Sequence, residues 1–340
     1  MEIKVLNQLC STEWDAFVES CPEATFFHRA GWREVIERAY RHDTHYLYAE
    51  EAGNIVGVLP LGHIRSRLFG NALISSPFCV YGGVAAITES ARMALERAAV
   101  DLAREKGVDY LEFRNRHPRA SGRTVKNLYF TFRKTLDPEP EKNLLAVPRK
   151  QRAMIRKGIT AGLQGVIDDS LDEFYQAYSL SLRNLGTPVH SMRYFAILRE
   201  VFGEACEILR VEHQGTTVAA VMNFYFRDEI LPYYGGGPTL ARNLHANDFM
   251  YWEVMRRAVE KGIRIFDYGR SKEGTGSYRF KTHWGFQPEP LPYEYELIKA
   301  SSMPDVNPLN PKYCLFISAW RRLPLPVSQW LGPWLARQLG

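Results

Sequence analysis

The sequence lacks the features that would place the protein in a membrane, in an oxidising compartment or around a structural metal. Its five cysteines are odd in number and form no C-x-x-C pair, which predicts reduced thiols rather than a disulfide framework or a zinc site. No apolar run approaches the roughly 18 residues that a membrane-spanning helix needs. Residues 1–5 form no basic and apolar leader, so we expect no signal peptide and a cytoplasmic location.

Charge and phosphate-binding motifs are also sparse. The net charge of +5 is mild for 340 residues, and no nucleic-acid recognition motif is present, which argues against a DNA-binding protein. No Gly-Lys-Ser/Thr sequence marks a P-loop, and no spacing of His, Cys, Asp and Glu suggests a metal site.

The sequence does contain one long pattern twice, with the copies about 162 residues apart. Thr-Phe-Phe-His at 25–28 is followed by Thr-Pro-Val-His at 187–190, Tyr-Gly-Gly at 81–83 by Tyr-Gly-Gly at 234–236, and residues 103–113 by 258–268. A repeat of this length indicates a duplicated domain rather than a solenoid. Because His28 and His190 occupy the same place in both copies, we interpret both as architectural.

Only the second copy continues into residues that could take part in a chemical reaction. Gly-Arg-Ser follows at 269–271, then Gly-Thr-Gly-Ser-Tyr-Arg-Phe-Lys at 274–281 and Trp-Gly-Phe at 284–286. This asymmetry predicts a working half and a supporting half.

Each copy has the same expected order of elements: a helix pair, three strands, a long amphipathic helix and a closing strand. The helices are expected at 12–20, 28–40 and 88–106, and again at 170–184, 191–203 and 247–261. Two strands flank Gly53 or Gly215, the third ends at each Tyr-Gly-Gly, and the last closes at 112–113 or 267–268. This order predicts an α/β fold with a mixed sheet covered by helices. The proline-containing stretch 134–147 is the expected linker.

This order resembles the GNAT acyltransferase fold, present here in tandem. Asp-Tyr-Gly-Arg at 267–270, together with Gly-x-Tyr-x-Phe-Lys-x-x-Trp-Gly at 276–285, resembles the FemAB family of aminoacyl transferases over nearly all of residues 1–300. Residues 307–313 and 320–324 further resemble the FemAB-related proteins of exosortase/PEP-CTERM exopolysaccharide systems. The resemblance implies a supporting GNAT-like domain at 1–137, a linker and basic helix at 138–162, a catalytic GNAT-like domain at 163–300, and an amphipathic helical tail at 301–340.

The resemblance also implies a catalytic centre in the second half. Lys281 is the first candidate, because a cation there would meet the charge that develops in acyl transfer; the alternative is a surface lysine. Arg270 suits a phosphate or carboxylate. Asp267 could assist proton transfer or positioning, or could be a structural carboxylate paired with Arg270.

The expected substrate-binding residues are of two kinds. Glycines and aromatics would approach or line the substrate: Tyr234, Gly235, Gly236, Tyr278 and Phe280. Basic residues of the stretch 149–157 would hold an anionic group, although such a face is often only solvated: Arg149, Lys150, Arg152 and Arg156.

The expected function is N-acyl transfer: an activated aminoacyl or acyl group moves onto an amine of a cell-envelope glycan or a peptidoglycan-type peptide precursor. No tightly bound cofactor is expected; aminoacyl-tRNA or acyl-CoA would be the co-substrate. A CoA-dependent GNAT enzyme would carry an Arg/Gln-x-x-Gly-x-Gly/Ala loop, and residues 242–247 contain no glycine. Two alternatives stay open: an acyl-CoA-dependent sugar acetyltransferase and a non-catalytic, membrane-associated scaffold.

The C-terminal tail carries apolar residues at helical spacing: Val327, Trp330, Leu331, Trp334, Leu335 and Leu339. One hypothesis is that the tail packs on the second domain or on a partner chain. The other is peripheral contact of residues 312–340 with the inner face of a membrane.

Overall fold

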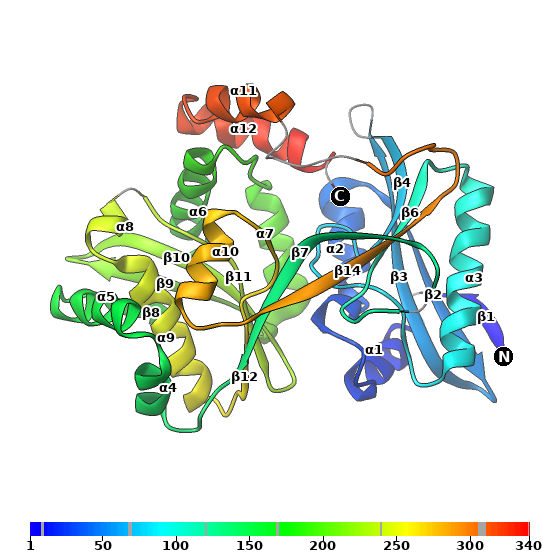
Figure 1. The fold of residues 1–340 in the computed structure, drawn as a ribbon, viewed down its shortest axis with the longest axis horizontal. Helices are drawn as coiled ribbons and strands as arrows, with labels where there is room; N and C mark the ends of the chain where they lie inside the picture. Colours follow the sequence, from blue (N-terminus) through cyan, green and yellow to red (C-terminus); the bar gives the residue numbers. More distant parts are fainter. Residues whose placement is uncertain are drawn as a thin grey trace. The chain divides into compact units, whose positions relative to one another are not determined.

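The computed structural model describes residues 1–7, 10–66, 70–119, 121–167, 170–238, 240–304, 311–338 and 340. Their contacts divide the chain into two compact units (Figure 1). Unit 1 comprises Met1–Tyr129, Pro290–Asp305 and Arg337–Gly340, and unit 2 comprises Phe130–Glu289 and Val306–Ala336. The domain borders predicted from the sequence repeat are a separate division of the chain, and they stay a prediction. Residues 307–310 and Leu339, used above, lie outside the described residues.

Unit 1 is built on a mixed sheet in the order β1-β2-β3-β4-β6-β14. Its strands are β1 (Glu2–Val5), β2 (Asp43–Glu51), β3 (Asn54–Ser66), β4 (Gly70–Ser75), β6 (Tyr110–Arg114) and β14 (Pro288–Leu297), with the short β5 (Ala85–Ala86) beside β3. Neighbouring strands are antiparallel except β4 and β6, which are parallel.

Unit 2 repeats this arrangement in the order β8-β9-β10-β11-β12-β7. Its strands are β8 (Gln164–Ile167), β9 (Cys206–His213), β10 (Thr216–Phe226), β11 (Glu229–Gly236), β12 (Ile265–Asp267) and β7 (Thr124–Thr135). Again one pair, β11 and β12, is parallel and the other neighbours are antiparallel. The mixed α/β fold with a helical tail, predicted from the sequence, is confirmed.

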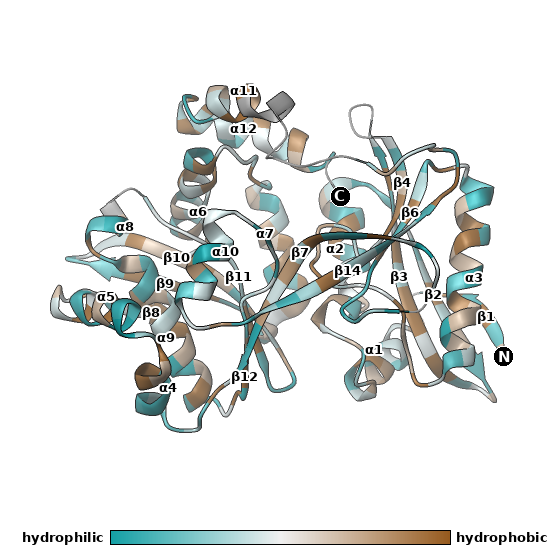
Figure 2. Ribbon diagram, in the orientation of Figure 1, coloured by the Kyte–Doolittle hydropathy of each residue, from teal (hydrophilic) through white to brown (hydrophobic). Residues whose placement is uncertain are grey.

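The helices of each unit follow the predicted order. Unit 1 has α1 (Ser11–Ser20), α2 (Gly31–Tyr40) and α3 (Glu89–Lys106); unit 2 has α6 (Leu171–Leu185), α7 (Met192–Phe202) and α9 (Ala246–Glu260). Figure 2 shows hydrophilic and hydrophobic residues on the same helix in α3, which suits a helix covering one sheet face. Within the described ranges, no helix is both long and apolar enough to cross a membrane.

The remaining helices lie in unit 2: α4 (Pro140–Ala146), α5 (Arg149–Thr160), α8 (Leu240–Asn243), α10 (Gly276–His283), and the tail helices α11 (Pro311–Trp320) and α12 (Leu325–Ala336). The expected linker at 134–147 is therefore partly regular. Proline occupies the first position of α4, where its missing N–H costs nothing, so the proline that suggested a linker starts a helix.

One predicted strand ends earlier than expected. The strand before the first Tyr-Gly-Gly, β4, ends at Ser75, six residues before Tyr81. Ser76 and Phe78 both have positive φ (41° and 69°) and flank Pro77, a conformation that cannot continue a strand. In unit 2 the equivalent strand, β11, does extend through the Tyr-Gly-Gly to Gly236.

The repeated histidines lie against the repeated Tyr-Gly-Gly segments. The His28 Nδ1 accepts the Thr25 backbone N–H at 3.0 Å, so the proton is assigned to Nε2, which donates to the Gly83 carbonyl at 2.8 Å. The His190 ring lies 4.7 Å from the Tyr194 ring and 5.9 Å from that of Tyr234, between centroids.

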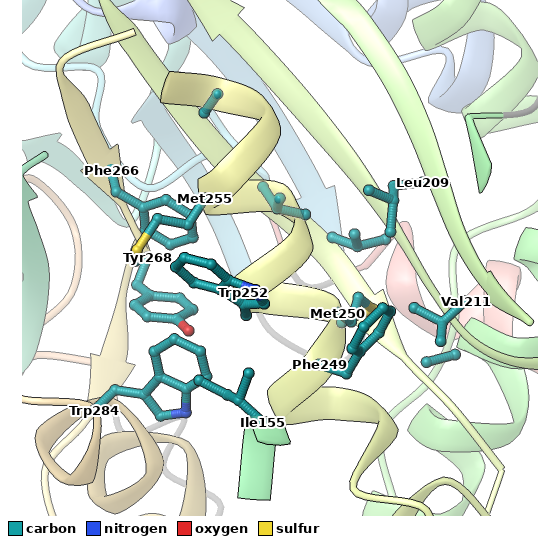
Figure 3. Packing of buried hydrophobic residues seen from close by; sticks show 14 of the residues in the cluster. Ile155, Leu209, Val211, Phe249, Met250, Trp252, Met255, Phe266, Tyr268 and Trp284 are labelled. Carbon is teal, nitrogen blue, oxygen red and sulfur yellow. The ribbon is translucent and has the colours of Figure 1, made fainter. Parts of the chain in front are cut away.

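The core of unit 2 joins α9, α10 and the end of β12. Figure 3 shows the rings of Trp252, Phe266, Tyr268 and Trp284 grouped together. The Trp284 side chain is fully buried, and its indole N–H donates to Asp248 Oδ1 at 3.0 Å, which ties α10 to the first turn of α9. This anchor fixes the position of α10.

Two tryptophans of the same unit should therefore respond differently to removal. Trp284→Ala should lower the free energy of unfolding by about 3–5 kcal/mol, because it leaves a cavity in the core. Trp330→Ala, at a residue that is 77% exposed, should change it by no more than about 0.5 kcal/mol. Urea denaturation followed by circular dichroism measures both values, and equal losses would contradict this description of the core.

Candidate functional site

The glycine-rich and Trp-Gly-Phe segments around Lys281 supply the residues that begin and end α10. Thr275 caps its start by accepting the Tyr278 backbone N–H at 3.4 Å. At its end Gly285 has φ +80°, and its N–H donates to the Thr282 carbonyl at 2.9 Å. The next N–H, of Phe286, reaches the Lys281 carbonyl at 3.2 Å, which completes a Schellman motif.

Lys281 is held by this helix against the loop that follows β12. Its side chain is buried, and Nζ donates to the Gly269 carbonyl at 2.9 Å and to the Arg270 carbonyl at 3.1 Å. The amine also lies 5.3 Å from the centre of the Phe132 ring. In the described part of the chain, no carboxylate lies within ion-pair distance of it.

Burial changes the acid–base behaviour of this amine. Loss of hydration disfavours the charged form and lowers the pKa of Lys281 from 10.5 to about 7, against the opposing effect of the Asp267 charge. The Arg270 charge lowers the pKa further. Lys281 can therefore exchange a proton at neutral pH, which a surface lysine cannot.

Asp267 ends β12 and is fully engaged. Its carboxylate accepts the Gly269 backbone N–H at 2.7 Å and the Thr131 hydroxyl at 3.4 Å. It forms an ion pair with Arg133 at 3.3 Å, and Arg133 also binds Glu229. Arg133 from β7 is thus a partner of Asp267 that the sequence did not suggest.

A second group of predicted residues lies at the end of β11. This strand pairs with β12 at Ile230↔Phe266 and then runs on to Gly236, whereas β12 stops at Asp267. The Tyr234 hydroxyl lies 2.7 Å from that of Tyr194. Burial raises the pKa of Tyr234 and lowers that of His190 to about 4, so both are neutral at physiological pH.

The two glycines of this segment allow close packing. A Cβ at Gly235 would lie 3.1 Å from the Tyr251 hydroxyl oxygen, and one at Gly236 would collide with Ser181. The backbone of Gly235 is thus approached by Tyr251, which comes from α9.

The two predicted aromatics of α10 pack on neighbouring rings. Tyr278 meets the rings of Phe130 and Phe132 edge-on, at centroid distances of 5.5 and 5.3 Å. Phe280 lies 5.7 Å from the Tyr251 ring. Tyr251 therefore touches both groups of predicted residues, those around Lys281 and those at the end of β11.

The predicted basic residues lie together on α5, which packs on α9 through Gly158 and Phe249. Arg149, Arg152 and Arg156 line an open hollow of about 570 Å³ together with Lys157. None of these basic side chains, nor Lys150, is within ion-pair distance of an acid among the residues described for this unit. Among the described residues of this unit, the basic side chains of α5 therefore have no acidic partner.

The start of α9 differs from a phosphate-binding loop. His245, which precedes the helix, has φ +54°, and the helix carries Asp248 in its first turn. Burial raises the pKa of Asp248, which is bonded to Trp284. An acid placed here disfavours a phosphate at the helix N-terminus whenever it is ionised.

The equivalent place in unit 1 is occupied by a permanent cation. In the aligned repeats, Glu112 and Arg114 at the end of β6 correspond to Asp267 and Gly269 at or just beyond the end of β12. The side chains of Glu112 and Arg114 form a buried ion pair at 2.7 Å. Arg114 also donates to the carbonyls of Cys79 at 2.8 Å and Gly340 at 3.2 Å. Both units thus bury a cation against backbone carbonyls, but only the lysine of unit 2 can lose its proton near neutral pH.

The structure brings Lys281, Asp267 and Arg270 together. It adds residues that the sequence did not single out for the site: Thr131, Arg133, Asp248 and Tyr251. The alternation of apolar Phe130 and Phe132 with polar Thr131 and Arg133 is a strand signal that could have found two of them. No group of three or more His, Cys, Asp or Glu side chains in the described ranges is arranged to hold a metal.

Comparison with known families matches residues 149–282 to the model of an acetyltransferase (GNAT) domain. The matched segment runs from the start of α5 to Thr282, and so contains Tyr234, Asp267, Arg270 and Lys281. No curated protein matches the chain in sequence.

Solved structures share the fold over most of the chain. The structure of FemX is 14% identical and covers 88% of this chain and 98% of its own, with a TM-score of 0.71. The C-terminal domain of a putative lysylphosphatidylglycerol synthetase from Agrobacterium fabrum is 16% identical, covers 86% and 93%, and has a TM-score of 0.59. A tandem GNAT protein from the clavulanic acid biosynthesis pathway is 13% identical, covers 88% and 99%, and has a TM-score of 0.56. The chain therefore shares its fold with these structures, one of which is a tandem GNAT protein, and its second unit carries the stretch that matches a GNAT domain.

Proposed function

We propose that the protein is an N-acyltransferase that moves an activated aminoacyl or acyl group onto an amine of a cell-envelope glycan or peptide precursor, in the cytoplasm. The observation that carries the proposal is the buried amine of Lys281, with a pKa of about 7, at the carboxyl end of β12. Ligands in open α/β sheets bind at this edge, and the segment matches a GNAT domain.

The chemistry requires a proton acceptor for the incoming amine. An acceptor ammonium must lose a proton before its nitrogen attacks the acyl carbonyl. The new C–N bond forms as the carbonyl oxygen becomes an oxyanion; the bond to the carrier then breaks, and the carrier leaves with the second proton of the amine. Lys281 in its neutral form takes the first proton, since a base with a pKa near the working pH is the most effective. The ammonium so formed then lies beside the developing oxyanion.

Asp267 acts through the backbone in this scheme. By holding the Gly269 N–H and Arg133, it fixes the loop whose carbonyls receive the Lys281 amine. Arg270 is proposed to hold the anionic part of the donor or acceptor, together with the basic residues of α5, Arg149, Arg152 and Arg156.

Two acyl donors are candidates, aminoacyl-tRNA and acyl-CoA. Asp248 in the first turn of α9 and the absence of glycine at 242–247 argue for a donor other than acyl-CoA, such as aminoacyl-tRNA. The match of residues 149–282 to an acetyltransferase domain favours the second candidate, an acyl-CoA-dependent transferase acting on a sugar amine.

The experiment that tests the function offers the purified protein both donors. Labelled acetyl-CoA and charged tRNA are each incubated with amino-sugar and peptide-stem acceptors, and amide products are followed by mass spectrometry. Amide formation with either donor supports the proposal and identifies the carrier. No product with any pair, in protein that binds neither donor, would favour the non-catalytic scaffold.

Replacement of Lys281 should separate its two chemical roles. Lys281→Met should lower kcat by roughly 10²–10⁴-fold, the range for loss of a general base. Lys281→Arg should be equally impaired, because arginine keeps the charge and cannot give up its proton. Lys142→Met, at an exposed lysine of α4, is the control and should keep full activity. Activity retained in Lys281→Arg would show that the cation alone matters.

The pH profile should report the same group. Since Lys281 works as a neutral base with a pKa lowered to about 7, kcat/KM should rise about tenfold per pH unit below pH 7 and level off above it. The residual activity of Lys281→Met should lack this inflection. A wild-type profile that keeps rising toward pH 10 would contradict the assignment.

A further inference from the structure

The tail helix α12 has an inverted pattern of burial. Its buried residues are among its smallest, Ser328, Gly332 and Ala336, which recur every fourth position. Its largest residues point the other way: 77% of Trp330 and 57% of Trp334 are exposed. A helix that merely covers a globular core buries its large apolar residues, so packing alone does not explain this sequence.

The inner face of the tail is docked closely on unit 2. A Cβ at Gly332 would lie 2.9 Å from the backbone nitrogen and oxygen of Val189, so only glycine allows this approach. Gln329 donates to the Ser179 hydroxyl of α6 at 2.8 Å. Figure 1 shows α12 beside α6. These contacts fix which face of the helix is left outward.

The turn between the two tail helices is attached to the end of α6. Arg183 donates to the Leu323 carbonyl at 3.2 Å, and Arg321 donates to the Leu185 carbonyl at 3.4 Å. Among the side chains of α11 that the structure describes, the large apolar ones that are exposed are Leu315, at 81%, and Phe316. We call Leu315, Phe316, Trp330 and Trp334 the tail surface.

The charged residues in the sequence of the tail are all basic. The chain has 38 acidic residues in 340, roughly one in nine, yet residues 306–340 contain none. The same stretch carries four basic residues: Lys312, Arg321, Arg322 and Arg337. Arg321 and Arg322 are exposed and, within the described ranges, have no acidic partner.

The exposed tryptophans and the basic residues of the tail indicate which of two partners, a second copy of the tail or a lipid bilayer, could cover the tail surface. A second copy of the tail would bring like charges together, which disfavours self-association. An anionic bilayer surface offers opposite charge to the arginines, and its headgroup level accommodates the apolar body and polar N–H of the indole ring. Paired tryptophans with flanking cations and no acids fit that surface.

We propose that the tail surface docks on an anionic lipid bilayer and holds the protein there as a peripheral protein. Trp330 and Trp334 enter the interface between headgroups and acyl chains, and Arg322 contacts lipid phosphates. This inference is independent of the acyl transfer proposed above.

Vesicle co-sedimentation of the full chain tests the proposal. Wild type should bind vesicles of phosphatidylcholine mixed with phosphatidylglycerol far better than vesicles of phosphatidylcholine alone, and added salt should weaken binding. Trp330→Ser/Trp334→Ser should lower the affinity at least roughly tenfold. Arg322→Ala should lower it about fivefold for the anionic vesicles only.

The matched control removes exposed apolar residues elsewhere. Ile87→Ser/Met93→Ser changes two exposed residues of unit 1 and should bind as wild type. Wild type that ignores anionic vesicles, or a tryptophan variant that binds them equally well, would overturn the proposal. Sedimentation velocity adds a further outcome: a wild-type dimer that the tryptophan variant converts to a monomer would assign the tail surface to a second copy.

Discussion

The candidate site depends on one interaction, the burial of the Lys281 amine against the carbonyls of Gly269 and Arg270. The two carbonyls accept hydrogen bonds from the amine, but no carboxylate among the described residues pairs with it directly. The free-energy cost of removing the charge from water is therefore not fully recovered. That imbalance brings its pKa near 7. The caps of α10, the Trp284 anchor and the Asp267–Arg133 pair all serve to hold this geometry.

The two units differ in the cation that lies at the end of the equivalent strand. In unit 1 the end of β6 is filled by Arg114, paired with Glu112 and bound to backbone carbonyls. A guanidinium stays charged at every physiological pH, so this arrangement stabilises the fold but cannot move a proton. In unit 2 a glycine stands at that strand position, and the cation comes instead from α10, as a lysine whose charge can change.

The sequence predicted the elements that local pattern determines. Helix periodicity, caps and the repeat gave the order of both units, and the Phe-Lys motif pointed to the helix that positions Lys281. What it could not give were contacts between distant segments. Arg133 and Asp267 are 134 positions apart, and the sheet places of β7 and β14 follow from pairing with strands far away in the chain. Arg133 was therefore not predicted as a partner of Asp267, and Tyr251 was overlooked because its aromatic ring looked like any core residue of an amphipathic helix.

The central claim, that the buried amine of Lys281 titrates near neutral pH, can be measured directly. Lysine labelled with ¹³C at Cε would be incorporated, and the Lys281 signal assigned by its absence from Lys281→Arg. Its chemical shift would then be followed from pH 5 to 11 by NMR. We expect a midpoint at about pH 7, well below that of the exposed lysines. A midpoint near 10.5 would show that the amine is ordinarily charged and would contradict its role as a base.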